Sequence, residues 1–144
     1  MKFILNIDKS KDEEVIVNAH EKTKLVEEIE KLVLNDTFEL IGYDSDKTSV
    51  LLDFQDVQCF VVNDGKVYAY TDNSKYYVKY RIYQLQEKLP SNFIKVNQSC
   101  IGNIKKISRF DASLAGSLII KFKCGYKDCV SRRQLKEFKE RFGL

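Results

Sequence analysis

The sequence has few of the residues from which most enzyme active sites are built. It contains a single histidine, His20, and we find no glycine-rich phosphate-binding loop, no nucleophile motif and no cluster of carboxylates. Catalysis of hydrolysis or group transfer depends on several such groups lying close together. We therefore expect no catalytic residue, no cofactor and no small-molecule substrate, and we interpret His20 as an exposed loop residue.

The chain also lacks long apolar stretches. No run approaches the roughly 20 apolar residues that span a bilayer, and the first apolar run, Phe3-Ile4-Leu5, is interrupted too early for a signal peptide. The 44% content of hydrophobic residues, with eight Tyr and nine Phe, is nevertheless too high for a disordered chain. We expect a globular, cytoplasmic protein that is rich in strands, because β-branched and aromatic residues are common.

Four cysteines lie in apolar segments of the chain: Cys59, Cys100, Cys124 and Cys129. Cys124 and Cys129 flank a turn at Gly125, so a disulfide or half of a metal site is conceivable there. No second pair has the spacing of metal ligands, and His20 is distant. We therefore predict no metal site, and we favour reduced thiols packed among strands, as is usual in the cytoplasm.

Charge is distributed unevenly along the chain. Residues 91–144 carry twelve Lys and Arg side chains against four Asp and Glu, whereas residues 1–90 carry twelve against seventeen. The net charge of +3 therefore conceals a basic final third next to an acidic remainder. Such a one-sided positive field is typical of a nucleic-acid-binding protein, although a solvated lysine-rich surface is the plainer alternative.

The start of the chain is expected to form a small appendage. Residues 2–8 alternate like a strand, and residues 15–17 form a second short strand that pairs with the first in a β-hairpin. Residues 21–34 then place apolar side chains on one face of an amphipathic helix and glutamates on the other. This apolar stripe packs either on the molecule's own sheet, which we favour, or on a second copy.

From residue 38 onwards the pattern is that of short strands separated by turns. Asn63-Asp64-Gly65 is the strongest local signal, because it supplies the positive φ that a tight hairpin requires. A short helix over residues 82–89 ends at Pro90, which cannot continue it. A final helix begins at Ser131, which forms a capping box with Gln134. The strands are expected at residues 40–43, 49–52, 57–62, 67–71, 76–79, 117–123 and 128–130.

Two arginines at the start of the final helix indicate an anionic partner. Arg132 and Arg133 lie at the positive end of the helix dipole, which costs about a few tenths of a kcal/mol each unless an anion is near. A phosphate would supply that anion, because free helix amides and guanidinium groups both donate to it. The alternative is that Arg132 pairs with an acidic side chain elsewhere on the surface.

Two segments of this basic third resemble the LytTR DNA-binding domain of bacterial transcription regulators. Residues 93–107, FIKVNQSCIGNIKKI, are similar to a family motif, and Val130-Ser131-Arg132 matches the Val-Ser-Arg motif at the family's last helix. The resemblance covers roughly residues 38–144, and the front end is similar to stand-alone members of Gram-positive bacteria. The sequence departs from the family pattern at Gly102, where valine is usual, and at Asn97-Gln98, where many relatives have His-Arg or Ser-Lys.

The resemblance implies a mainly β fold, with an elongated arrangement of small antiparallel sheets, about ten strands, a short mid-chain helix and a C-terminal helix. It also implies that loops on one edge enter successive major grooves, with base contacts from the Gly65-Lys66 tip, Asn97, Gln98 and Arg132. Amide side chains suit adenine and arginine suits guanine, whereas the other basic residues suit phosphates. We expect the DNA-binding residues to be Lys66, Lys95, Asn97, Gln98, Ser99, Lys105, Lys106, Arg109, Ser131, Arg132, Arg133 and Lys136.

The function expected is that of a response-regulator-like transcription regulator that binds specific double-stranded DNA as a homodimer on repeated half-sites. Residues 1–37 are too short for a receiver domain, so we expect them to be a dimerisation or regulatory appendage to a DNA-binding domain at residues 38–144. Control would then come from dimerisation or from a separate protein, such as the membrane-protein inhibitor that stand-alone relatives have.

Two other functions remain open. Residues 57–80 could form the exposed sheet of a protein-interaction module, or the basic surface could bind nucleic acid without sequence preference. The many tyrosines between residues 68 and 80 could stack on single-stranded RNA bases, although alternating strands more often use them to fill both faces of a sheet. A DNA-reading protein loses affinity steeply with salt yet keeps its preference for one duplex, which separates these classes.

Overall fold

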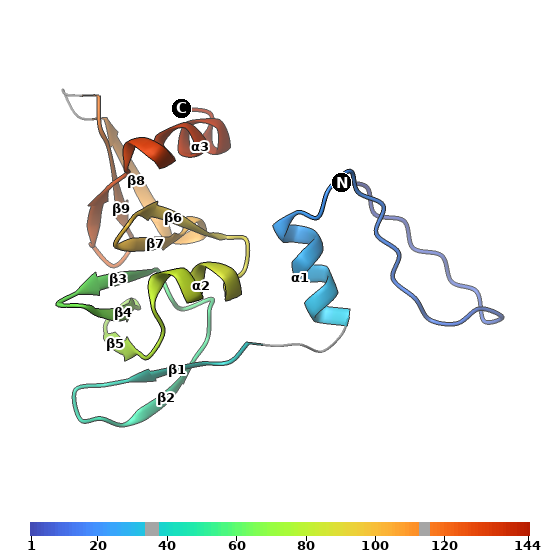
Figure 1. Ribbon diagram of the computed structural model, residues 1–144, viewed down its shortest axis with the longest axis horizontal. Coiled ribbons are helices and arrows are strands. Elements are labelled where there is room, and N and C mark those ends of the chain that lie inside the picture. Colours follow the sequence, from blue (N-terminus) through green and yellow to red (C-terminus); the bar gives the residue numbers. More distant parts are fainter. Residues whose placement is uncertain (34–37, 113–115) are drawn as a thin grey trace. The chain divides into compact units, whose positions relative to one another are not determined.

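The protein consists of two units. The computed structural model describes residues 1–33, 38–112 and 116–144 (Figure 1). The two compact units are Met1–Asp36 and Thr37–Leu144. Among the described residues, the first unit contains one helix, α1 (Lys24–Val33), and the second contains ten strands and the remaining helices. No described helix is long and apolar enough to cross a membrane.

The segment before α1 contains no strand. The chain reverses at residues 8–11, where the Asp8 carboxylate accepts hydrogen bonds from the backbone N–H (3.0 Å) and the hydroxyl (2.7 Å) of Ser10. Within residues 1–33 no strand ladder joins residues 2–8 to residues 15–17, so the predicted β-hairpin is wrong. Phe3 is 86% exposed, and a pair of strands without a covering layer is only marginally stable in water.

The helix α1 is shorter than expected. It begins after Thr23, whose carbonyl accepts from the Glu27 N–H at 3.0 Å and whose hydroxyl accepts from the Val26 N–H at 3.4 Å. Its apolar residues form the predicted stripe, yet none of its side chains is buried. The predicted end of the helix, at residue 34, lies outside the described residues.

The second unit is built from two antiparallel sheets, which confirms the prediction of a mainly β fold with about ten strands. The seven-stranded sheet has the order β2-β1-β5-β4-β3-β7-β6 (Figure 1). The three-stranded sheet has the order β10-β9-β8. The short mid-chain helix α2 (Ile82–Lys88) and the C-terminal helix α3 (Arg132–Phe142) are present as predicted. The strands are β1 (Leu40–Tyr43), β2 (Ser49–Leu52), β3 (Cys59–Asn63), β4 (Lys66–Tyr70), β5 (Lys75–Val78), β6 (Phe93–Asn97), β7 (Cys100–Asn103), β8 (Ile107–Ala112), β9 (Leu118–Phe122) and β10 (Lys127–Cys129).

The tight hairpin between β3 and β4 is confirmed. Asp64 and Gly65 have φ values of 50° and 73°, which is the backbone of a two-residue hairpin turn. Asn63 pairs with Lys66 across it. The sequence Asn-Asp-Gly was predictive here because these residues adopt the left-handed conformation at little cost.

The two faces of the seven-stranded sheet bury separate cores. Alternate residues of β3 divide between them: Phe60 lies in the core beneath α2, and Cys59 and Val61 lie in the core shared with the three-stranded sheet and α3. Gly102 faces the second core, where a Cβ atom would lie 2.6 Å from the Cζ atom of Phe122. The departure from the family pattern at Gly102 therefore makes room for a phenylalanine of the other sheet.

Candidate nucleic-acid interface

Two turns lie together at one end of the seven-stranded sheet. β3 and β7 are antiparallel neighbours, so the turn that follows β3 and the turn that precedes β7 occupy the same end. A hydrogen bond from the Val62 N–H to the Ser99 carbonyl (2.8 Å) joins them. Gln98 and Ser99 form the β6–β7 turn and are exposed, and Lys66 is exposed at the start of β4.

Asn97, the last residue of β6, fastens the β6–β7 turn to β10. Its amide nitrogen donates to the Asp128 carboxylate (2.9 Å) and to the Cys129 carbonyl (2.9 Å), and its amide oxygen accepts from the Ser99 N–H (2.8 Å). A primary amide has two hydrogens to donate, and both are engaged within the protein. In this structure Asn97 therefore positions the turn, and Gln98 is the amide that remains free to face a ligand.

The helix α3 begins beside the same strand. The Ser131 N–H donates to the Val96 carbonyl (2.9 Å), which places the start of the helix next to Asn97. The predicted capping box is wrong, because the Ser131 side chain makes no capping hydrogen bond. A capping box also needs the N–H of the first residue for the Gln134 side chain, and here Val96 already occupies that N–H.

Three basic side chains project from the first turns of α3. The side chains of Arg132 and Arg133 are exposed, and within the described part of the chain neither side chain takes part in a hydrogen bond or an ion pair. Lys136 is exposed as well, with Nζ 3.9 Å from the Glu140 carboxylate. The alternative in which Arg132 pairs with an acidic residue is thus absent from the described residues. We name the following set the turn edge: Lys66, Gln98, Ser99, Ser131, Arg132, Arg133 and Lys136.

The family model of the LytTr DNA-binding domain matches residues 47–143, a range that includes the whole turn edge. The chain belongs to the LytTR family. This assignment makes it a DNA-binding transcription regulator and confirms the resemblance seen in the sequence.

Relatives and solved structures agree with the LytTR assignment. HTH-type transcriptional regulators described as uncharacterized, from Staphylococcus aureus strains MSSA476 and NCTC 8325, are each 32% identical, over 100% of this chain and 99% of their own length. The solved LytTr DNA-binding domain of a methyl-accepting/DNA response regulator from Bacillus cereus superposes with a TM-score of 0.67. That match has 18% identity and covers 74% of this chain and 99% of the solved domain, so it shows the fold.

The LytTR fold of this chain differs from a helix-turn-helix. In that motif two helices are joined by a short turn. Here α2 and α3 are separated by β6 to β10, and α1 and α2 are separated by β1 to β5. Among the described residues no two helices follow one another directly, so this part of the chain contains no helix-turn-helix.

Several residues predicted to bind DNA lie away from the turn edge of this LytTR domain. Lys105 and Lys106 belong to the short helix η1 (Ile104–Lys106), which follows β7 at the opposite end of the β6–β7 hairpin from Gln98. Lys95 is half-buried in the middle of β6. The sequence motif at residues 93–107 therefore spans a whole hairpin, and only its turn joins the turn edge.

A second basic group lies on the three-stranded sheet. Arg109, Lys121 and Lys127 are directly opposite one another on β8, β9 and β10, so their side chains share one face. The neighbours of Lys121 on β9 are buried, which places this face on the outside of the sheet. Asp111 forms an ion pair with Arg109 at 3.1 Å and offsets part of the charge. We name Arg109, Lys121 and Lys127 the basic row.

Sequence reasoning missed two members of the basic row. Lys121 alternates with buried residues along β9, and Lys127 is exposed at the start of β10. The excess of Lys and Arg after residue 90 was the available signal. Their alignment with Arg109 depends on strand register, which the sequence pattern alone leaves open. Like charges directly opposite one another are destabilising, so this row favours an anion.

The cysteines are free thiols, as favoured from the sequence, and three of them lie in the core. All four are free, and Cys124 does not pair with Cys129 across the turn at Gly125. Cys59, Cys100 and Cys124 instead gather in the core between the two sheets. Among the described residues, no group of three His, Cys, Asp or Glu side chains is arranged to hold a metal ion.

Proposed function

We propose that this regulator recognises specific double-stranded DNA through the turn edge, with Gln98 and Arg132 contacting base edges in the major groove. The observation that carries the proposal is the juxtaposition of these two residues. They are 34 positions apart in the sequence, yet the Asn97 and Ser131 hydrogen bonds bring their segments together. Both side chains are exposed, so neither has to be released from the protein before it contacts DNA.

The two side chains have the chemistry for different bases. A glutamine amide can donate to and accept from adenine, and a guanidinium group can donate twice to guanine. Each such pair contributes about 1–3 kcal/mol of discrimination between bases. Lys66, Arg133 and Lys136 belong to the same turn edge, and we assign these residues to backbone phosphates, which set the register of the protein on the duplex.

The start of α3 supports a phosphate contact close to Arg132. The first N–H groups of a helix are unpaired and carry partial positive charge, so they attract an anion. Two arginines at this end are unfavourable for the isolated helix, and a phosphate makes them favourable. The Ser131 hydroxyl, which makes no capping bond, is available to donate to the same group.

The basic row and the lysines of η1 have a different role in this proposal. Ionic contacts to DNA release condensed counterions, so they add affinity without sequence preference. We assign Lys95, Lys105, Lys106 and the basic row to such contacts on flanking DNA. The activity proposed is binding, not catalysis, and its site of action is bacterial DNA in the cytoplasm.

We further propose that the protein acts as a homodimer on repeated half-sites. Residues 1–37 form the appendage for this contact and residues 38–144 the DNA-binding domain. The exposed apolar side chains of the first unit support its role in a contact between copies: Phe3, Ile7 and Leu32 are each at least 72% exposed. A membrane-protein inhibitor that competes for the same apolar surface is a second candidate for control.

The rival function of single-stranded RNA binding is disfavoured by the tyrosines themselves. Three of them form a row of direct neighbours across β1, β5 and β4, namely Tyr43, Tyr77 and Tyr68. Lysine ammonium groups already lie over all three rings: Lys79 at 4.8 Å from the Tyr43 centroid, Lys66 at 5.7 Å from Tyr77 and Lys75 at 5.4 Å from Tyr68. A stacking platform for bases needs open ring faces.

Selection of bound duplexes from a random pool tests the proposal. We expect the wild-type protein to enrich a repeated motif and Arg132→Ala to relax one position of it, with affinity for the best duplex reduced about tenfold to a hundredfold. Lys139→Ala is the matched control, because it removes one positive charge from the last turn of the same helix. If Arg132→Ala and Lys139→Ala changed the enriched motif and the affinity equally, Arg132 would be a nonspecific contact and its assignment to a base would be overturned.

A further inference from the structure

Three thiols from distant parts of the chain meet between the two sheets. Cys59 on β3 and Cys100 on β7 are completely buried. They lie on neighbouring strands and on the same face of the sheet. Cys124, from the turn between β9 and β10, packs against them. The three thiols therefore belong to one core, and two of them are shielded from solvent.

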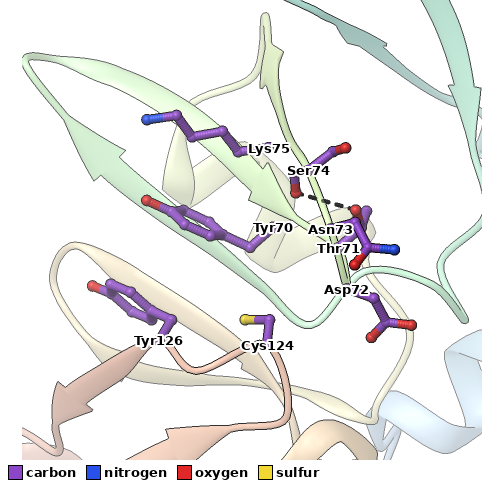
Figure 2. A pocket seen from close by; sticks show the side chains of 8 residues that line it. All are labelled: Tyr70, Thr71, Asp72, Asn73, Ser74, Lys75, Cys124 and Tyr126. Carbon is purple, nitrogen blue, oxygen red and sulfur yellow. Dashed lines mark hydrogen bonds between the residues drawn. The ribbon is translucent and has the colours of Figure 1, made fainter.

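Of the three, only Cys124 reaches solvent. It lines a pocket of about 350 Å³ together with residues 70–75 and Tyr126, and Figure 2 shows its sulfur pointing into that pocket beside the two tyrosines. Small molecules can therefore reach one face of the Cys124 sulfur. Its other neighbour is the buried Cys59 thiol, which solvent does not reach.

The position of Cys124 is fixed by hydrogen bonds on both sides of the turn. Its N–H donates to the side-chain oxygen of the buried Gln58 (2.6 Å), and the Gln58 amide nitrogen donates in turn to Asp72. The Phe122 N–H donates to the Tyr126 carbonyl (2.8 Å) and closes the turn. These hydrogen bonds hold the turn that carries Cys124 beside Gln58, the residue that precedes Cys59 in the chain.

The environment separates the two thiols chemically. A hydrogen bond from the Cys59 thiol, helped by the Tyr126 N–H and opposed by partial burial, lowers the pKa of Cys124 to about 6. The neighbouring thiols of Cys100 and Cys124, together with burial, raise the pKa of Cys59. At neutral pH the accessible Cys124 sulfur is a thiolate and the buried Cys59 sulfur keeps its proton. This is the arrangement of a nucleophilic cysteine next to a resolving cysteine.

We propose that Cys124 is a peroxide-reactive thiol and that Cys59 converts its oxidised form into a disulfide within the same chain. In the first step the Cys124 thiolate attacks a peroxide oxygen, the O–O bond breaks and hydroxide leaves, which gives a sulfenic acid on Cys124. In the second step the Cys59 sulfur attacks the Cys124 sulfur, the S–S bond forms, and the hydroxyl group leaves as water with the Cys59 proton. The two sulfurs lose two electrons and hydrogen peroxide is reduced to one water and one hydroxide, which takes up a proton from solvent to give the second water.

Cys129 provides an internal comparison for this site. It is exposed on β10, whereas Cys124 is only half-exposed, so accessibility alone predicts that Cys129 reacts first. Its sulfur lies near its neighbour's carbonyl, 3.7 Å from Val130 O, and is not part of the core that holds the other three thiols. The proposal predicts the opposite order of reaction.

The test begins with unmodified wild-type protein, because no variant is needed for the order of reaction. The reduced full chain is treated at pH 7 with limiting hydrogen peroxide, blocked with N-ethylmaleimide and mapped by mass spectrometry. We expect two free thiols to be lost together, with a peptide that joins Cys59 to Cys124, while Cys129 and Cys100 are blocked. Oxidation of Cys129 before Cys124, or a disulfide between any other pair, overturns the proposal.

Three variants then separate the two steps. Cys59→Ser should stop at the sulfenic acid, which a dimedone probe captures on Cys124. Cys124→Ser should lose fast peroxide consumption, whereas Cys129→Ser should behave as wild type. Circular dichroism shows whether each variant is folded. Equal peroxide consumption by folded Cys124→Ser and wild type overturns the proposal. For a variant that does not fold, the peptide map of the wild type decides alone.

Discussion

The side-chain amide of Asn97 donates a 2.9 Å hydrogen bond to the carboxylate of Asp128, 31 residues further along the chain. Asp128 also accepts from the Tyr126 hydroxyl (2.7 Å), so one carboxylate holds the β6–β7 turn and β10 together. Through this contact the two LytTR motifs form one surface. The exposed side chains that we propose to contact DNA are therefore positioned by Asn97, whose own amide is bonded within the protein.

Replacing Asn97 with alanine should therefore lower the stability of the protein and should lower its affinity for every duplex by a similar factor. The substitution removes three side-chain hydrogen bonds at a half-buried position, and we expect the free energy of unfolding to fall by about 1–3 kcal/mol. Guanidinium unfolding and binding to a panel of duplexes measure the two effects. Asn73→Ala, in an exposed loop, is the control. A changed base preference at unchanged stability would instead make Asn97 a base-contacting residue.

Local sequence signals predicted the parts of the fold that depend on neighbours in the chain. The Asn63-Asp64-Gly65 turn, the end of α2 before Pro90 and the alternating strands all follow from local conformation and periodicity. The Ser131 capping box failed because a distant carbonyl, that of Val96, binds the N–H that the motif needs. The hairpin at residues 2–17 failed because alternation indicates a strand only where another layer covers it.

The sequence predicted which residues belong to the candidate site, but not which of them lie close together in the fold. Gln98, Arg132 and Lys66 could be found from residue type and family motif. Lys66 and Gln98 lie at one edge because of the order β4-β3-β7-β6 in the sheet, and Arg132 joins them through the hydrogen bond from Ser131 to Val96. The basic row and the three-thiol cluster depend on register between strands that are far apart in sequence. Periodicity determines which face a residue takes, but not which residue of another strand lies opposite.

The basic row should show a conflict between stability and binding. Lys121 lies between Arg109 and Lys127, so Lys121→Gln should raise the free energy of unfolding by about 0.2–1 kcal/mol as like-charge repulsion falls. If the row contacts phosphates, the same change lowers DNA affinity and reduces the slope of log affinity against log salt concentration by about 1. Lys11→Gln, in the first unit, is the control for net charge. An unchanged salt slope would remove the row from the interface.

A larger residue at Gly102 should destabilise the protein unless Phe122 is replaced by a smaller residue. In Gly102→Val the new side chain meets the Phe122 ring, and we expect a loss of about 1–3 kcal/mol of stability from overpacking. Phe122→Leu alone leaves space in the same core and is also destabilising. The double variant should be more stable than the sum of the two losses predicts. Additive losses in thermal or guanidinium unfolding would show that the two positions do not share the space.

A charge on the apolar face of α1 should separate the proposed dimer. Leu32 is 72% exposed, so Leu32→Glu removes nothing from the core of a monomer, but it places a carboxylate in a contact between copies. We expect sedimentation to show a monomer, with weaker binding to a two-half-site duplex and unchanged binding to a single half-site. Lys31→Glu, away from the apolar stripe, should remain dimeric. A wild-type protein that is monomeric on DNA would overturn the dimer proposal.

The pH dependence of Cys124 alkylation should show whether the Cys59 thiol is the group that lowers its pKa. Only the thiolate is alkylated, so the rate of modification by iodoacetamide should rise with pH and reach half its maximum near pH 6, where the pKa of Cys124 lies. The pKa is low because the Cys59 thiol donates a hydrogen bond to the thiolate. Removal of that donor in Cys59→Ala should therefore shift the midpoint to higher pH.

The same experiment has a conservative comparison. Cys59→Ser keeps a hydroxyl that donates to the Cys124 sulfur, so its midpoint should stay closer to that of the wild type than the midpoint of Cys59→Ala. The distinction matters because both variants alter the packing of a buried position, and only one removes the hydrogen bond. Identical midpoints in the two variants would mean that the core around Cys59, and not its thiol, controls the ionisation of Cys124.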